Sequence, residues 1–248
     1  MKLREWLDKF RKFTWTRGYT CDHCGRELFD YPNRRLCEEC EGEFFRPIRT
    51  CPKCGRETVA EGVCLTCKRQ MPKFTQGLSA FAYKGELALA VNRMKNGNPR
   101  LAAYFGERMA EVFLETVEGA NDRSWLILPV PLTEKRRRER GYNQAELLAE
   151  SLQSRLEQQG VVAIIDKELL LKTRETALQK EKSARERANN AQGAYHVHKR
   201  KACEGKSILL VDDILTTGAT GSACARSLLG AKAKEVIFLT VAAMPERK

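Results

Sequence analysis

The chain has 248 residues and a mass of 28.2 kDa, which is enough for one sizeable hydrophobic core and a small additional module. Seventeen glycines and eight prolines exclude a low-complexity or collagen-like polymer, and no apolar run approaches the ~18 residues of a membrane-spanning helix. Lys and Arg outnumber Asp and Glu by 44 to 32. The resulting net charge of +12 favours polyanionic partners such as nucleic acid, polyphosphate metabolites or an anionic membrane surface.

The first 18 residues carry apolar side chains at helical spacing, with basic residues on the other faces, so they predict a basic amphipathic helix. The apolar positions are Leu3, Trp6, Leu7, Phe10 and Phe13. We expect this stripe to pack against the rest of the protein; peripheral contact with a membrane surface or a partner helix is the alternative. Charges interrupt the apolar residues every two or three positions, so there is no continuous apolar region of a secretory signal. A cytoplasmic location is therefore expected.

Eight of the ten cysteines form four Cys-x-x-Cys pairs, a spacing that lets two thiolates converge on one cation. The pairs are Cys21 and Cys24, Cys37 and Cys40, Cys51 and Cys54, and Cys64 and Cys67. We assign one zinc ion to the first two pairs and a second to the last two, although the spacing also allows interleaved ligation. A shell of four thiolates leaves no open position for water or substrate, so both ions are expected to be structural.

Two other uses of these cysteines are less consistent with the sequence. A disulfide framework is disfavoured in a reducing compartment, and a redox pair would be expected beside a βαβ pattern. Cys203 and Cys224 lie outside the pattern and are expected to be free thiols. His23, His196 and His198 are expected to be bystanders and not metal ligands.

Beyond residues 68–74 the pattern changes to alternating strands and helices. Asn98 and Pro99 suit a helix start and Gly119 suits its end, so 99–118 is predicted to be a helix, and 142–159 is another. Predicted strands lie at 125–130, near 161–165, at 168–172, 194–198, 207–211 and 236–242. This alternation indicates an α/β domain with a mostly parallel sheet and helices on both faces.

The most informative stretch runs from Ser207 to Ala225. An apolar strand ends in Asp212 and Asp213, at the edge where open α/β sheets bind ligands. The loop that follows consists of Thr216, Thr217, Gly218, Ala219 and Thr220 and leads into a helix. Its hydroxyls and free N–H groups suit a phosphomonoester, and the acids suit the vicinal hydroxyls of an attached ribose. The alternative is an ordinary strand–turn–helix with capping threonines. Walker A and Rossmann glycine patterns are absent.

Two further polar segments accompany this loop. Residues 135–140 are predicted to form a basic loop of a size suited to pyrophosphate; its candidate ligands are Lys135, Arg136, Arg138 and Arg140. The segment 172–195 is predicted to be a mobile lid, with Arg174, Gln179, Arg187 and Asn190 as candidate contacts. Either segment alone is also consistent with a solvated run of charge.

The 207–225 stretch resembles the phosphoribosyl pyrophosphate (PRPP) motif of type I phosphoribosyltransferases. With the cysteine pairs, the Arg-Gly-Tyr-Asn-Gln segment at 140–144 and the 174–195 pattern, the chain resembles the bacterial ComF family from about Cys21 to Val241. This resemblance implies a zinc-binding module joined to a phosphoribosyltransferase-like domain; with the residue patterns above, we expect an amphipathic helix over 1–18, a double zinc ribbon over 19–70 and the phosphoribosyltransferase-like domain over 75–248. Many ComF-like chains carry ligands for one Cys₄ site, whereas this chain has ligands for two, so its zinc topology departs from the family pattern.

The same resemblance implies PRPP with Mg²⁺ as a ligand and a role in DNA uptake beside a cytoplasmic competence helicase. Excess positive charge favours single-stranded DNA as a further partner. The alternative is an active Mg²⁺-dependent phosphoribosyltransferase in which Asp212 and Asp213 are catalytic. No segment indicates a pocket for the acceptor of such a reaction, so we favour a binding protein of DNA uptake.

Overall fold

The computed structural model describes residues 20–30, 33–172 and 194–246. The predicted helix over 1–18 and the four predicted lid residues of 174–190 lie outside these ranges. Within the described part of the chain, no helix has both the length and the apolar character needed to cross a membrane.

A five-stranded parallel sheet forms the centre of the molecule, in the order β1-β7-β6-β2-β3. Its strands are β1 (Gln76–Ala82), β2 (Trp125–Pro129), β3 (Ala163–Ile165), β6 (Ser207–Leu215) and β7 (Glu235–Ala243). A separate antiparallel pair consists of β4 (Leu170–Lys172) and β5 (Tyr195–Val197). The central strands are nearly continuous apolar runs, as expected for a parallel sheet that is covered on both faces.

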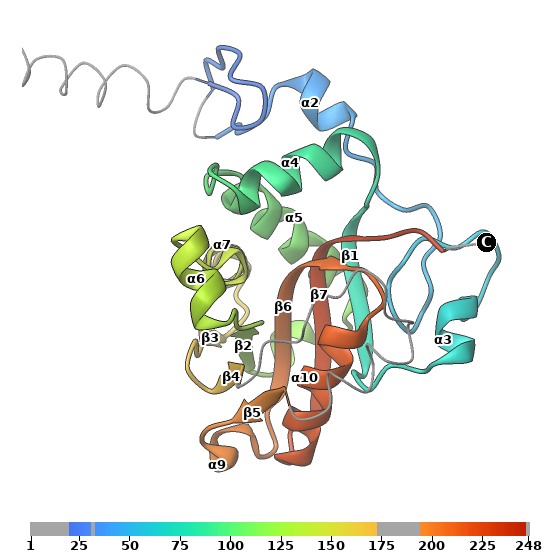
Figure 1. The fold of residues 1–248 in the computed structure, drawn as a ribbon. Coiled ribbons are helices and arrows are strands. Elements are labelled where there is room, and N and C mark those ends of the chain that lie inside the picture. Colours follow the sequence, from blue (N-terminus) through green and yellow to red (C-terminus); the bar gives the residue numbers. More distant parts are fainter. Residues whose placement is uncertain (1–19, 31–32, 173–193, 247–248) are drawn as a thin grey trace, which may run out of the picture.

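Helices cover the two faces of the sheet (Figure 1). One face carries α4 (Gly85–Lys95), α5 (Leu101–Thr116) and α7 (Gln144–Gln158), and the other carries α10 (Ala219–Gly230). Side chains alternate along β6, so Leu209 and Val211 join the core beneath the first face, whereas Ile208 and Leu210 join the core beneath α10. The fold class expected from the sequence is thereby confirmed.

Shorter helices lie at the ends of these elements. They are α2 (Glu38–Gly42), α3 (Leu65–Arg69), a 3₁₀ turn (Ala120–Asp122), α6 (Glu134–Arg140) and α9 (Arg200–Cys203). The prediction of a basic loop over 135–140 was wrong, because these residues form α6. Thr133 caps that helix by accepting a hydrogen bond from the Arg136 N–H, and Gly141 ends it at φ +82°.

The two cysteine modules join different hydrophobic cores. Cys21 and Cys37 join the core that contains α4 and α5, and the second module joins the core that contains α10. His23 is buried at the first contact, where its ring lies 3.1 Å from a carboxylate oxygen of Glu86 and its carbonyl accepts a hydrogen bond from Arg93. His23 therefore joins the first module to α4.

Candidate functional site

The carboxyl ends of β2 and β6 lie side by side at one edge of the sheet, because the two strands are parallel neighbours. The chain leaves β2 towards α7 on one face and leaves β6 towards α10 on the other face. Strands that diverge in this way mark the switch point at which open α/β sheets bind ligands. The basic helix α6 follows β2, and the loop 216–220 follows β6, so both segments lie at this edge of the sheet (Figure 1).

The segment 216–220 is open to solvent; Gly218 is its left-handed residue, and its last two residues already belong to α10. Thr216, Thr217 and Thr220 are exposed, and Gly218 at φ +79° caps the twelve-residue helix α10. Among the described residues, the N–H groups of Thr217 and Gly218 have no hydrogen-bond acceptor. Free N–H groups at the start of a helix of this length can bind a phosphate or another anion.

The two acids belong to β6 itself, which is four residues longer than the predicted strand at 207–211. Successive side chains of a strand point to opposite faces, so Asp212 and Asp213 have different neighbours, although their charges still interact. Asp212 is half-buried and Asp213 is buried, with 6% of its surface exposed. The sequence places the acids at the right edge of the sheet, but the extra strand length gives each its own environment.

Asp213 lies at the centre of a polar network on the α7 side. One carboxylate oxygen is 2.9 Å from the Lys95 ammonium, and the other accepts a 2.7 Å hydrogen bond from the Gln144 amide. The Gln144 carbonyl oxygen in turn accepts from Arg140 at 2.6 Å. Tyr142 holds the turn after α4 by donating to the Met94 carbonyl and accepting from the Gly97 N–H. The network therefore fixes both the acid and its lysine.

Asp212 faces the opposite side, towards α10. Burial and the nearby Asp213 charge raise the pKa of Asp212 to about 7. Burial, and after it the Asp212 charge, raises the pKa of the Cys224 thiol, which lies in the core beneath α10. Asp212 thus changes its protonation state near neutral pH, whereas Asp213 is held by a cation and an amide.

Helix α6 carries exposed cations at the same edge of the sheet. Lys135, Arg136 and Arg138 are exposed and make no ion pair within the described ranges. Arg137 pairs with Glu146 at 3.1 Å, and Arg140 is engaged by Gln144. Of the four candidate pyrophosphate ligands, three thus make no ion pair with a described residue, and Arg140 supports Gln144, the partner of Asp213.

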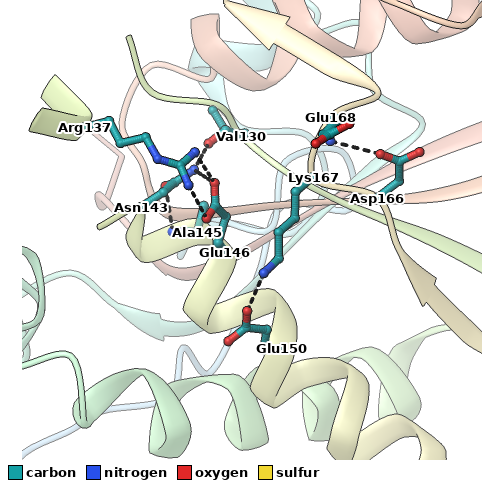
Figure 2. Close-up of polar contacts among 9 residues, drawn as sticks. All are labelled: Val130, Arg137, Asn143, Ala145, Glu146, Glu150, Asp166, Lys167 and Glu168. Carbon is teal, nitrogen blue, oxygen red and sulfur yellow. Dashed lines mark hydrogen bonds and ion pairs between the residues drawn. The ribbon is translucent and has the colours of Figure 1, made fainter. Parts of the chain in front are cut away.

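Helix α7 is anchored next to α6 (Figure 2). Asn143 caps α7 by accepting from the Ala145 N–H at 3.1 Å, and its amide donates to the Val130 carbonyl at the end of β2. Further along α7, Glu150 pairs with Lys167, and the Asp166 carboxylate accepts from the Glu168 N–H. These contacts hold the start of α7 against β2 and so place Gln144 beside Asp213.

The eight cysteines gather into two groups of four, and in each group the sulfur atoms lie within 4.8 Å of one another. The groups are Cys21, Cys24, Cys37 and Cys40, and Cys51, Cys54, Cys64 and Cys67. This grouping is sequential and not interleaved. The Cys24–Cys37 and Cys54–Cys64 sulfur distances are both 3.7 Å. A tetrahedral shell with Zn–S bonds of ~2.3 Å has sulfur–sulfur edges of about 3.8 Å, so both groups could hold a zinc ion.

Two side chains of the site were not predicted from the sequence. Lys95 reaches Asp213 from α4, and Arg56 reaches the loop 216–220 from the second cysteine module, where it donates to the Thr216 carbonyl at 2.8 Å. Both contacts join residues more than 100 positions apart, and no local pattern marks either residue. For Arg56, the only hint in the sequence is that it belongs to the repeated Cys-Gly-Arg-Glu at 24–27 and 54–57; Lys95 has no such hint.

Comparison with known proteins agrees with this architecture. The phosphoribosyl transferase domain family matches residues 138–248. The chain is 28% identical to the Bacillus subtilis (strain 168) competence protein ComFC over 206 residues, 80% of this chain and 79% of that protein. It is 29% identical over 201 residues to the DNA utilization protein YhgH of Salmonella typhimurium (strain LT2), 78% of this chain and 84% of that protein.

Among solved structures, it is similar to the allosteric regulatory enzyme of purine biosynthesis, with a TM-score of 0.33 and 20% identity. That similarity covers 58% of this chain and 26% of the enzyme.

Proposed function

Since this chain belongs to the ComF family, we propose that it acts in the uptake or use of DNA and binds PRPP between β2 and β6. The observation that carries PRPP binding is the loop 216–220. It is exposed, begins a twelve-residue helix at the switch point and directly follows two acids. The names of the relatives support the role in DNA use.

In this proposal each part of PRPP has its own group of residues. The 5′-phosphate binds the loop N–H groups and threonine hydroxyls, and the ribose hydroxyls donate to Asp212 and Asp213. The pyrophosphate lies towards Lys135, Arg136 and Arg138. Mg²⁺ would neutralise part of the pyrophosphate charge when it is bound. Asp213 is already paired with Lys95. For a ribose hydroxyl to reach the Asp213 carboxylate, the lysine side chain must therefore move away or contact the ligand itself.

Calorimetry of the full chain with ribose 5-phosphate, and separately with PRPP and Mg²⁺, tests the site. We expect binding by the wild type and its loss in Gly218→Val, because valine is strained at φ +79°. Gly160→Val is the matched control: Gly160 has φ +78°, lies beyond the far end of α7 and would place its new Cβ in open space. Absence of heat with the wild type would overturn the proposal.

Single-stranded DNA binding is tested through α6. We propose that Lys135, Arg136 and Arg138 contact phosphates, so replacing all three with Gln should weaken binding of a labelled oligonucleotide and flatten its salt dependence. The control variant replaces three exposed lysines at the opposite edge of the sheet with Gln: Lys199, Lys201 and Lys234. It removes the same amount of positive charge from a different part of the surface. Fluorescence anisotropy between 50 and 200 mM salt measures both variants; equal losses would show that only net charge matters.

Turnover is the second candidate function, and the match to the phosphoribosyl transferase domain favours it. In that case the chain would release pyrophosphate from PRPP with Mg²⁺ and an acceptor, and Asp213→Asn would abolish the release. A coupled pyrophosphate assay over nucleobases, nucleotides and DNA ends detects it. No release with any of them, despite PRPP binding, would leave the chain as a binding protein.

Two further partners complete the proposal. Each Cys₄ group binds a structural zinc ion, and elemental analysis should find about two zinc ions per chain. By family resemblance, a competence helicase is the protein partner, and its affinity should depend on PRPP if the ligand regulates assembly. Equal helicase affinity with and without PRPP would remove that regulation.

A further inference from the structure

The two cysteine modules share a short repeat but use it differently. Cys-x-x-Cys-Gly-Arg-Glu occurs at 21–27 and again at 51–57, and each copy closes with an equivalent bridge, Thr20 to Glu27 and Thr50 to Glu57. Arg26 in the first copy is exposed and pairs with Glu39. Arg56 in the second copy is buried, with 4% of its surface exposed. The repeat therefore supplies an internal control for Arg56.

Arg56 bridges the second Cys₄ group and the loop 216–220. Its Nε lies 3.4 Å from the Cys54 sulfur, and its Nη2 donates to the Thr216 carbonyl at 2.8 Å. One guanidinium thus contacts both a cysteine of the metal-ligand type and the backbone of the proposed phosphate loop.

The module that carries Arg56 is fixed against the sheet by close backbone contacts. The Gly77 N–H at the start of β1 donates to the Lys53 carbonyl at 2.9 Å. A Cβ on Gly55 would lie 2.5 Å from the Gly77 carbonyl oxygen, and a Cβ on Gly77 would lie 2.7 Å from the Cys54 carbonyl oxygen. Only glycine at both positions allows this approach. Arg56 therefore reaches the loop from a rigid support.

The contact at Thr216 orients the next peptide group. In a planar trans peptide, the carbonyl and the following N–H point in opposite directions. Because Arg56 holds the Thr216 carbonyl towards the cysteine module, the Thr217 N–H points away from that module. This N–H has no acceptor among the described residues and is one of the proposed phosphate donors.

We propose that Arg56 is a positioning residue of the phosphate site and that it makes ligand affinity depend on metal in the second Cys₄ group but not in the first. This inference rests on the proposed function, since it concerns the same loop. Without the metal, the Cys54 side chain would no longer be held in place. Arg56 would then lose its fixed position, and the Thr216–Thr217 peptide would lose its orientation. Among the described residues, the first group has no arginine that reaches the loop, because Arg26 pairs with Glu39 on the surface.

Matched variants of the full chain test the role of Arg56. Arg56→Met should weaken ribose 5-phosphate binding in calorimetry by about 10- to 100-fold, because a charged donor to the loop is lost. Arg26→Met should leave the affinity within about twofold of the wild type. Arg56→Lys retains one donor and should recover part of the affinity. Both Met variants should keep two zinc ions per chain, as measured by elemental analysis.

The metal dependence is tested by removing one ligand from each group. Cys67→Ser and Cys40→Ser should each lower the zinc content from two ions to one, but only Cys67→Ser should weaken ribose 5-phosphate binding. Equal affinities of Arg56→Met and the wild type, or equal effects of the two Cys variants, would overturn the inference. If the wild type itself does not bind ribose 5-phosphate, the proposed function fails instead.

Discussion

The ion pair between Lys95 and Asp213 should make a measurable contribution to stability. The ammonium lies 2.9 Å from the carboxylate, and the two side chains are 21% and 8% exposed. In Lys95→Met the buried carboxylate loses its cation and keeps only the Gln144 amide. Breaking a buried pair costs about 3–5 kcal/mol, and the partial exposure of Lys95 places our expectation near the lower limit, about 3 kcal/mol. For a chain of this size, that lowers the melting temperature by about 6–12 °C.

A double-mutant cycle distinguishes the interaction free energy of the Lys95–Asp213 pair from the individual effects of the two substitutions. Asp213→Asn removes the charge but keeps an oxygen for Gln144, so adding it to Lys95→Met should restore most of the lost stability. Thermal unfolding with excess zinc keeps metal occupancy constant across the set. Lys167→Met is the control, since Lys167 and Glu150 form a pair in which both side chains are more than 40% exposed, worth at most about 1 kcal/mol.

Two results would refute this reasoning. If Lys95→Met melts within 2 °C of the wild type, the carboxylate is solvated well enough not to need the lysine. If Asp213→Asn restores nothing in the Lys95→Met background, the lysine stabilises the protein through its packing and not through the ion pair.

Three other measurements examine separate parts of the molecule. Folding raises the pKa of Asp212 from its ordinary 3.8 to about 7, so ionising it opposes folding as pH rises through this window. Between pH 5.5 and 8 the wild type should lose about 2 kcal/mol more stability than Asp212→Asn; parallel melting curves would contradict this. Gly77→Val should destabilise the protein by driving a Cβ into the Cys54 backbone, whereas Gly42→Val meets open space and should not. Chelation should release two zinc ions per chain and lower the melting temperature; unchanged melting would argue against a structural metal.

Local signals were sufficient for much of the sheet and for the position of the loop 216–220. The strands β2, β6 and β7 are apolar runs bounded by polar or turn residues, and Gly218 marks a turn that leads into a helix. In contrast, β1 was missed because its glycine, serine and alanines form a weak strand pattern. Helix α6 was mistaken for a loop because its seven residues contain no apolar side chain, so no helical periodicity is visible.

The chemistry of the site was less predictable than its position. Asp212 and Asp213 look equivalent in the sequence, and only the length of β6 shows that they face different surroundings. Lys95 and Arg56 enter the site through tertiary contacts, which have no local signature. In the same way, Arg26 and Arg56 occupy identical repeat positions, and only the packing of each module distinguishes them.

The edge position of β1 has a consequence for biosynthesis. This strand pairs only with β7, which is the last strand of the sheet to leave the ribosome. Until residues 235–243 are synthesised, β1 has no neighbour in the central sheet, and the second cysteine module has no completed sheet on which to dock. Formation of this region must therefore await nearly the whole chain, since contacts between distant segments form late. A nascent chain that stops before β7 would expose this unpaired edge to chaperones and proteases.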